Sequence, residues 1–170
     1  MQTNEAGTGV AMKTRILIAD DHEVVRRGLC TLLQTHEGWE ICGEAKDGRE
    51  AVEMAKQMSP DVAILDVSMP NLSGLAATRQ LVKYNPNQKV IILTITDSDE
   101  VIREALDAGA RGFVLKSDAV RDLVSAVEAL QLNRMLLTPR VYDMVLDGFL
   151  HGKTPKLPGF FPLQTAGRRF

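Results

Sequence analysis

The sequence has few of the features that would place it in several common classes of protein. Cysteine is scarce: Cys30 and Cys42 are the only two in 170 residues, and their spacing fits no metal-binding motif. We expect both thiols to be reduced and buried, as suits a cytoplasm. No stretch approaches the ~20 apolar residues that span a bilayer, and the polar segment 1–13 lacks the apolar centre of a signal peptide. The net charge of −2 predicts no general attraction to nucleic acid or acidic membranes. The composition therefore predicts a soluble, cytoplasmic protein without a membrane partner.

The chain does contain five apolar segments, each followed by a segment with helical spacing. The predicted strands are 15–19, 39–45, 62–65, 89–94 and 112–115. Four are continuous apolar runs, which favours strands buried on both faces of a parallel sheet, whereas segment 39–45 alternates like a half-exposed edge strand. Apolar residues then recur on one face of each predicted helix. Those faces include Val25, Leu29 and Leu33 after the first strand, and Val120, Leu123 and Val127 after the fifth.

This alternation predicts an α/β fold in which helices cover both faces of an open, doubly wound parallel sheet. A strand order of 2-1-3-4-5 would bring the carboxyl ends of the first and third strands together at a topological switch point. Beyond the fifth helix, Thr138 and Pro139 open a further helix that extends to Gly152. Segment 153–170 contains three prolines and no acidic residue, and we expect it to be a flexible tail or the start of a linker.

Ionisable side chains follow three of the predicted strands directly. Asp20 and Asp21 follow the first strand, Asp66 the third and Lys116 the fifth. Such groups are costly in a core but well placed in a crevice at the edge of a sheet. Each residue also has an ordinary interpretation, since either of the first two aspartates suits a helix N-cap and a single lysine suits the surface. The functional interpretation depends on all four side chains meeting in one place.

Three neighbouring carboxylates cannot all stay ionised without a compensating cation, because like charges raise one another's pKa. Mg²⁺ is the natural partner, since it takes oxygen ligands and commonly pairs with phosphate oxygens. Lys116 supplies a flexible positive charge for an anion. The hydroxyl of Thr94, at the end of the fourth strand, would face the same crevice and hydrogen-bond a phosphoryl oxygen. The sequence therefore predicts a site for phosphoryl chemistry on an aspartate.

Four segments of the chain resemble a bacterial two-component response regulator receiver domain in both order and spacing. They are residues 16–22 (ILIADDH), 65–74 (LDVSMPNLSG), 93–94 (LT) and 108–116 (AGARGFVLK). The resemblance implies the flavodoxin-like (CheY-like) fold and points to the NarL/FixJ (LuxR-type) subfamily. It covers residues 14–131, which leaves 132–152 as a linker helix, and 153–170 lies beyond. The helix-turn-helix output domain usual in the subfamily is expected to be absent; an excised receiver, a truncated gene product and a stand-alone receiver stay open.

The resemblance also implies a role for each residue of the predicted site. Asp66 would accept the phosphoryl group and ligate Mg²⁺ together with Asp21 and the backbone carbonyl of Ser68, while Asp20 would act through water. Lys116 would pair with the phosphoryl group. Thr94 would move toward that group and Phe113 would turn inward as a switch, which repacks the face formed by the fourth helix, fifth strand and fifth helix.

The function implied is a phosphorylation-controlled signalling receiver and not an enzyme with a separate substrate. It would take phosphate from a sensor histidine kinase and catalyse its own phosphorylation and dephosphorylation. The parent protein would be a transcription regulator that reaches DNA only through its output domain, and a homodimer stays open.

Three departures from the family pattern and three alternative functions accompany this prediction. Phe113 stands where a tyrosine is often found, Ile95 where the residue is often small, and Ser117 where many receivers have proline. Ile95 and Phe113 support an alternative, a phosphorylation-independent dimerisation or interaction module with the same fold. A metal-dependent phosphatase would need an aspartate where Ser68 stands, and a flavodoxin would need a phosphate cradle after the first strand.

Overall fold

The computed structural model describes residues 12–152 and contains a five-stranded parallel sheet in the order β2-β1-β3-β4-β5. This order confirms the predicted doubly wound fold. The observed strands begin one residue earlier than predicted in β1 and end one residue later in β3. Their bounds are β1 Thr14–Ala19, β2 Trp39–Ala45, β3 Val62–Asp66, β4 Lys89–Thr94 and β5 Gly112–Leu115.

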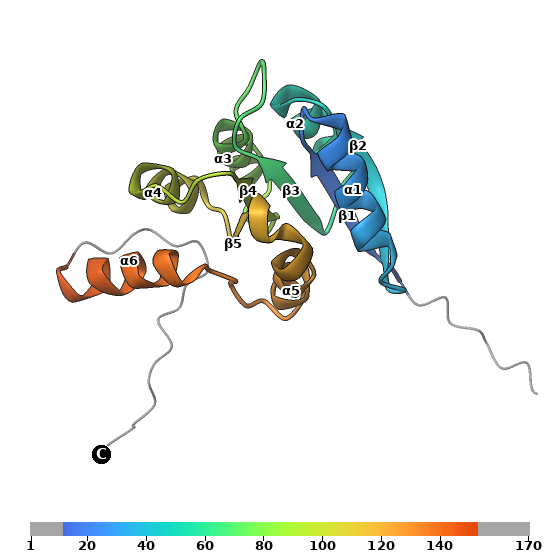
Figure 1. Ribbon diagram of the computed structural model, residues 1–170. Coiled ribbons are helices and arrows are strands. Elements are labelled where there is room, and N and C mark those ends of the chain that lie inside the picture. Colours follow the sequence, from blue (N-terminus) through green and yellow to red (C-terminus); the bar gives the residue numbers. More distant parts are fainter. Residues whose placement is uncertain (1–11, 153–170) are drawn as a thin grey trace, which may run out of the picture.

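Helices cover both faces of the sheet (Figure 1). One face carries α1 and α5, and the other carries α2, α3 and α4. A sixth helix, α6, follows at the β5 edge. The helix bounds are α1 Glu23–Gln34, α2 Gly48–Met58, α3 Gly74–Tyr84, α4 Asp99–Ala108, α5 Ala119–Gln131 and α6 Pro139–Leu150, with a short 3₁₀ turn η1 at Lys116–Asp118.

Successive side chains of the inner strands enter two separate apolar cores. In β1, Ile16 and Ile18 pack toward α1 and α5, whereas Leu17 and Ala19 pack toward α2 and α3. All five residues of β3 are buried. This is why these strands are continuous apolar runs: neither face of the sheet meets water.

Strand β2 lies at the edge of the sheet, as its alternating pattern predicted. Its pairing with β1 slips by one residue, since Ile16 lies opposite Ile41 but Leu17 lies opposite Gly43. Cys42 therefore falls in a bulge and is half-buried, which differs from the predicted full burial. Cys30 is buried as predicted, and burial raises the pKa of its thiol to about 12. Both thiols are free within residues 12–152 and poorly suited to reaction at neutral pH.

Two residues predicted for buried helix faces are exposed instead. Val25 lies in the first turn of α1 and Val120 in the first turn of α5, where its side chain is 80% exposed. The first turns of both helices lie beside the carboxyl edge of the sheet. The sheet offers less surface to pack against there than it does in its middle. Arg26 is buried in place of Val25.

The chain continues beyond α5 along the outer side of β5. Leu136 forms an isolated parallel bridge with Gly112, and its carbonyl accepts a hydrogen bond of 3.1 Å from the Phe113 N–H. Helix α6 then packs against the core through Val141 and Val145. The predicted helix over 138–152 is confirmed, with Thr138 as its N-cap.

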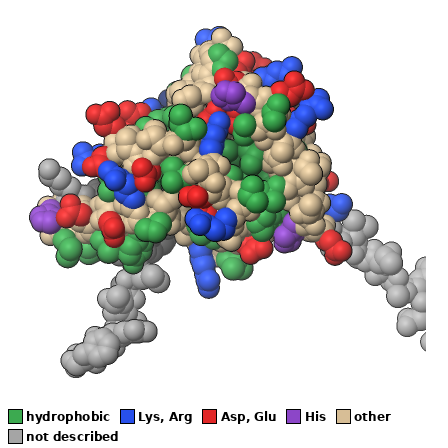
Figure 2. All heavy atoms as spheres, viewed as in Figure 1, with side chains coloured by type: hydrophobic (Ala, Val, Ile, Leu, Met, Phe, Trp, Pro, Cys, Tyr) green, Lys and Arg blue, Asp and Glu red, His purple; other side chains and the backbone are tan. Residues whose placement is uncertain are grey.

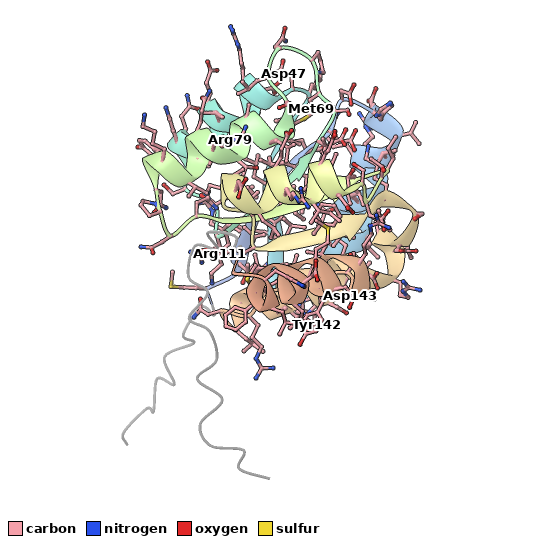
Figure 3. All side chains as sticks on the ribbon, turned by 90° about the vertical axis from the view of Figure 1, so that its left-hand side faces the viewer. Asp47, Met69, Arg79, Arg111, Tyr142 and Asp143 are labelled. Carbon is pink, nitrogen blue, oxygen red and sulfur yellow. The ribbon has the colours of Figure 1, made fainter. Side chains whose placement is uncertain are left out.

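The other face of α6 is exposed to solvent (Figure 3), where Tyr142 and Asp143 lie on the outer side. One ion pair of 2.7 Å joins Arg140 of α6 to Asp99 at the start of α4. On the face of the molecule drawn in Figure 2, acidic and basic side chains are interspersed over the helices. None of the helices within residues 12–152 combines the length and apolar character required to cross a membrane. The predicted tail at 153–170 lies outside the described residues.

Candidate functional site

Two aspartates from neighbouring strands form the centre of the site. Asp66 ends β3, and Asp20 directly follows β1, whose last residue Ala19 pairs with Leu65. Both carboxylates therefore emerge side by side at the carboxyl edge of the sheet, and both are buried. The predicted convergence of β1 and β3 is present.

Lys116 reaches these carboxylates from the far end of β5. Its ammonium nitrogen lies 2.9 Å from Asp20 Oδ2 and 3.2 Å from Asp66 Oδ2. The single ammonium group is thus shared between the Oδ2 atoms of both carboxylates. One positive charge thus faces two buried negative ones, and oxygens remain that a hard cation could use.

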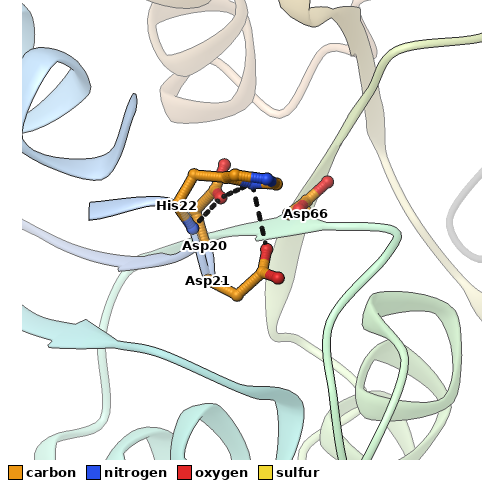
Figure 4. Close-up of side chains that lie close together, drawn as sticks. All are labelled: Asp20, Asp21, His22 and Asp66. Atoms are coloured by element: carbon orange, nitrogen blue, oxygen red, sulfur yellow. Dashed lines mark hydrogen bonds and ion pairs between the residues drawn. The ribbon is translucent and has the colours of Figure 1, made fainter. Parts of the chain in front are cut away.

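The third carboxylate and a histidine complete the cluster (Figure 4). His22 Nδ1 lies 3.2 Å from Asp20 Oδ1 and 3.1 Å from Asp21 Oδ1. Asp21 is about one-third exposed, whereas the His22 side chain is 65% exposed. The N-cap position of α1 is His22, which leaves both aspartates outside the helix and removes the N-cap alternative for them.

Crowding shifts the ionisation of the site. Burial raises the pKa of Asp66 above its ordinary value, and the charge of Asp20 raises it further, against the opposing effect of Lys116. Burial alone would lower the pKa of Lys116, but its contacts with Asp20 and the charge of Asp66 outweigh burial and raise that pKa. The site therefore favours an additional positive charge beside Asp66.

Backbone contacts fix the position of both central aspartates. The guanidinium of Arg26 donates a hydrogen bond of 2.8 Å to the Asp20 carbonyl and one of 3.2 Å to Glu44. On the other side, Gly74 opens α3 so close to β3 that a Cβ atom there would lie 1.9 Å from the Asp66 carbonyl oxygen. The Gly74 N–H donates to Val67 at 2.9 Å. The sequence LDVSMPNLSG therefore folds back on the end of the strand that carries Asp66.

The two predicted switch residues lie near this edge but contact other groups. The Thr94 hydroxyl donates to the Thr96 carbonyl at 2.9 Å and accepts from the Thr96 N–H at 3.2 Å. Phe113 is 2% exposed and belongs to the same apolar cluster as Val141 and Val145. Ile95, after Thr94, is 80% exposed. The Ser68 backbone N–H lies close enough to Asp66 to oppose the rise in its pKa.

Sequence reasoning missed two residues of this site. His22 is next to the paired aspartates, and that adjacency was the available signal for it. Arg26 had no such signal, because a charged residue one turn into a helix usually faces solvent. Its burial follows from the tertiary contacts with the Asp20 carbonyl and with Glu44.

Residues 16–128 match the family model described as the response regulator receiver domain. The chain belongs to this family. Among its relatives, the response regulator GacA of Pseudomonas viridiflava is 33% identical over 127 residues, which are 75% of this chain and 59% of that protein. The transcriptional regulatory protein LiaR of Bacillus subtilis is 34% identical over 144 residues, 85% of this chain and 68% of the relative.

Solved receiver structures superpose on the same residues. A LuxR-family two-component response regulator from Aurantimonas sp. SI85-9A1 is 29% identical, has a TM-score of 0.75, and is covered over 99% of its chain and 81% of this one. The isolated receiver domain of RcsB from Salmonella enterica serovar Typhimurium, solved with the phosphoryl mimic BeF₃⁻, is 27% identical with a TM-score of 0.71. That match covers 78% of this chain and 98% of the other.

These findings confirm the receiver domain and its NarL/LuxR-type relatives, in preference to the phosphatase and flavodoxin alternatives. The chain spans 59% of the length of the GacA relatives. The similarity therefore does not extend to everything that those whole proteins bind and regulate.

Proposed function

We propose that this receiver accepts a phosphoryl group on Asp66 from a sensor histidine kinase and later releases it as inorganic phosphate. The observation that carries the proposal is the position of the Asp66 carboxylate, 3.2 Å from Lys116 and beside two further aspartates. A carboxylate nucleophile with a fixed countercharge suits covalent phosphoryl transfer.

In the transfer step, a carboxylate oxygen of Asp66 attacks the phosphorus of a phosphohistidine. A P–O bond forms, the P–N bond breaks, and the departing imidazole takes up a proton. Lys116 neutralises charge on the phosphoryl oxygens. Hydrolysis reverses the modification, because water attacks the phosphorus, the aspartyl P–O bond breaks, and the carboxylate and inorganic phosphate are released.

Mg²⁺ fits the donor set, because the carboxylates of Asp20, Asp21 and Asp66 lie close together with one ammonium group, which leaves the site with excess negative charge. Asp21, Asp66 and the Ser68 carbonyl would hold the ion directly, and Asp20 would hold it through water. When bound, Mg²⁺ supplies electrostatic stabilisation of the transferring phosphoryl group. Arg26 and Gly74 keep the two aspartate-bearing strand ends in place for it.

The phosphoryl group would then bias a two-state element. Thr94 would exchange its contact with Thr96 for a phosphoryl oxygen, and Phe113 would repack with the face formed by α4, β5 and α5. In this division, residues 14–131 form the receiver, and 132–152 form the helix that connects it to an output domain in the parent transcription regulator. Contact with DNA belongs to that output domain, and dimerisation of the receiver would accompany the switch.

Acetyl phosphate and Mg²⁺ test the central step directly. Intact-mass measurement should detect the addition of one phosphoryl group to the wild-type chain, no addition to Asp66→Asn, and normal addition to Asp107→Asn, which changes an exposed aspartate of α4. Failure of the wild type to gain mass, or an undiminished gain in Asp66→Asn, would refute the proposal.

The burial of Phe113 in this structure favours one alternative, the phosphorylation-independent interaction module, because the switch side chain is already inside. Light scattering with and without beryllofluoride separates the two. A change in oligomeric state or shape on addition of the mimic supports the switch, whereas identical behaviour supports the module.

A further inference from the structure

His22 lies within the group of carboxylates that would hold the metal. One side-chain ligand atom from each of Asp20, Asp21, His22 and Asp66 lies within 4.8 Å of the other three. Ligands on opposite sides of a small dication bound at about 2.1 Å are about 4.2 Å apart. The four ligand atoms therefore exceed the span of a single coordination shell by about 0.6 Å at most. Figure 4 shows how the four side chains gather.

The local backbone keeps His22 in this position. Its N–H donates a hydrogen bond of 2.8 Å to Asp20 Oδ1, and its φ and ψ of −89° and 105° are those of an extended residue that turns into α1. The ring nitrogen that faces the carboxylates is Nδ1, at 3.1 Å from Asp21 and 3.2 Å from Asp20. The side chain is largely exposed, which leaves it room to turn toward an ion.

A second observation points to a cation at the same place. The side chains of Asp20 and Asp66 are 0% and 4% exposed, and the Oδ2 atoms of both lie against the one ammonium group of Lys116. Lys116 supplies one charge to this pair, so that a negative balance is left in a desolvated pocket.

We propose that His22 is a nitrogen ligand of the divalent ion and makes this site selective for first-row transition dications such as Ni²⁺ over Mg²⁺. Mg²⁺ prefers oxygen ligands and keeps several waters, whereas imidazole nitrogen binds nickel well. Nδ1 would bind through its lone pair, with the proton on Nε2. This inference rests on the proposed function, because it concerns the ion that assists phosphorylation of Asp66.

A purely structural role for His22 makes a different prediction. An imidazole that only donates a hydrogen bond to Asp20 and Asp21 would influence metal affinity by positioning the carboxylates. Its removal would then change the affinity of the site for every cation by a similar factor. Removal of a nitrogen ligand, by contrast, would lower the affinity for Ni²⁺ much more than the affinity for Mg²⁺. The comparison of two metals in one variant separates these roles.

The experiment is calorimetric titration of the full chain with Mg²⁺ and with Ni²⁺ at one pH near neutrality. We expect the wild type to bind Ni²⁺ at least about tenfold more tightly than Mg²⁺, and His22→Gln to lose about tenfold or more in Ni²⁺ affinity with Mg²⁺ affinity changed less than about twofold. The chain contains two other histidines, and His36→Gln and His151→Gln should both behave as wild type at this site. Paramagnetic broadening of the His22 ring protons by Ni²⁺ confirms that the ion binds beside His22, and the comparison of the two metals in His22→Gln decides ligation.

Ni²⁺ affinity that is unchanged in His22→Gln, or that falls in parallel with Mg²⁺ affinity, would overturn the assignment of His22 as a ligand. Either result leaves the proposed function intact if Mg²⁺ still binds and Asp66 is still phosphorylated. If the wild type binds neither ion and gains no phosphoryl group, the proposed function fails together with the inference.

Discussion

A few ionisable side chains at the carboxyl edge of the sheet form the proposed site of this receiver, and each changes the ionisation of the others. Asp66 sits in a buried position beside Asp20, and both effects raise its pKa, while Lys116 opposes the rise. Removing one partner of a buried ion pair leaves the other charges without compensation, which is more costly than the pair itself is stabilising. We therefore expect Lys116 to be important for folding, besides its proposed role in phosphoryl transfer.

We predict that Lys116→Met is less stable than wild type by about 3 kcal/mol at neutral pH. The pKa of Asp66 would rise further, so that the folded state would hold its proton more tightly than the unfolded state. A carboxyl group whose pKa is higher in the folded state than in the unfolded state stabilises the fold at low pH. This stabilisation is lost as the pH rises from the unfolded-state pKa through the folded-state pKa. The deficit of the variant should therefore shrink as the pH is lowered.

Urea unfolding near pH 5 and near pH 7 measures this effect. The raised pKa of Lys116 itself adds stability that is lost only above its ordinary value of 10.5, outside this window. Lys83→Met, which changes an exposed lysine of α3, is the matched control and should show no such pH dependence. A deficit of equal size at both pH values would contradict the prediction.

At the scale of elements, the site depends on how closely helices begin against the ends of strands. Helix α3 starts at Gly74, where the chain packs directly on the Asp66 carbonyl, and Ser73 caps it by accepting a hydrogen bond of 3.1 Å from the Ala76 N–H. Glycine is needed there for close approach, since φ at this position is not in the left-handed region. A side chain would push α3 away from β3.

Two glycine substitutions should accordingly have opposite effects. Gly74→Ala should destabilise the fold by about 3 kcal/mol or more, because the added methyl group meets backbone that cannot move without displacing Asp66. Gly28→Ala lies on the exposed side of α1, where a Cβ meets no atom of residues 12–152 within 4 Å. It should stabilise by about 0.5–1 kcal/mol, as alanine does in a helix interior.

Chemical denaturation measures both variants, and Mg²⁺ titration of Gly74→Ala shows whether the displaced helix weakens the site. Wild-type stability in Gly74→Ala would mean that the start of α3 does not fix Asp66. A loss of stability in Gly28→Ala would contradict the helix-propensity argument instead.

At the scale of the whole molecule, α6 is attached to the receiver by few contacts. Val141, Val145, the bridge at Leu136 and the ion pair between Arg140 and Asp99 hold it beside β5 and α4. Elements with few buried contacts open without unfolding the rest of a domain. Because Phe113 belongs to the same apolar cluster as Val141 and Val145, we expect release of α6 to expose the part of that cluster around Phe113, the proposed switch residue.

We predict that Val145→Asp releases α6 while the sheet stays folded, since an unpaired charge at this buried position costs about 2 kcal/mol or more. Hydrogen exchange should become faster in α6 and at Phe113 but stay unchanged in β3. Leu146→Asp changes the next residue, which is 44% exposed, and should leave exchange as in wild type. Indistinguishable exchange in the two variants would show that Val145 does not hold α6.

The sequence alone determined the strands, the alternating layers and the residues that end at the sheet edge. Short apolar runs such as 62–65, in alternation with segments of helical spacing, favour strands buried on both faces. An aspartate directly after such a run is then expected at the edge of the sheet. The resemblance then supplied the roles of Asp66 and Lys116, which stay predictions until phosphorylation is measured.

Only the tertiary structure decided which side chains leave or enter the core near the site. Helical spacing indicates which residues share a face, but it does not show where the sheet beneath them ends, so Val25 and Val120 were placed inside when they are exposed. Burial of Arg26 depends on its contact with Glu44, and the hydrogen bond from the Phe113 N–H to the Leu136 carbonyl joins parts of the chain that are apart in sequence. The approach of His22 to the carboxylates depends on how the backbone turns between β1 and α1. Their physical cause is packing and charge in three dimensions, which a local pattern of residues does not encode.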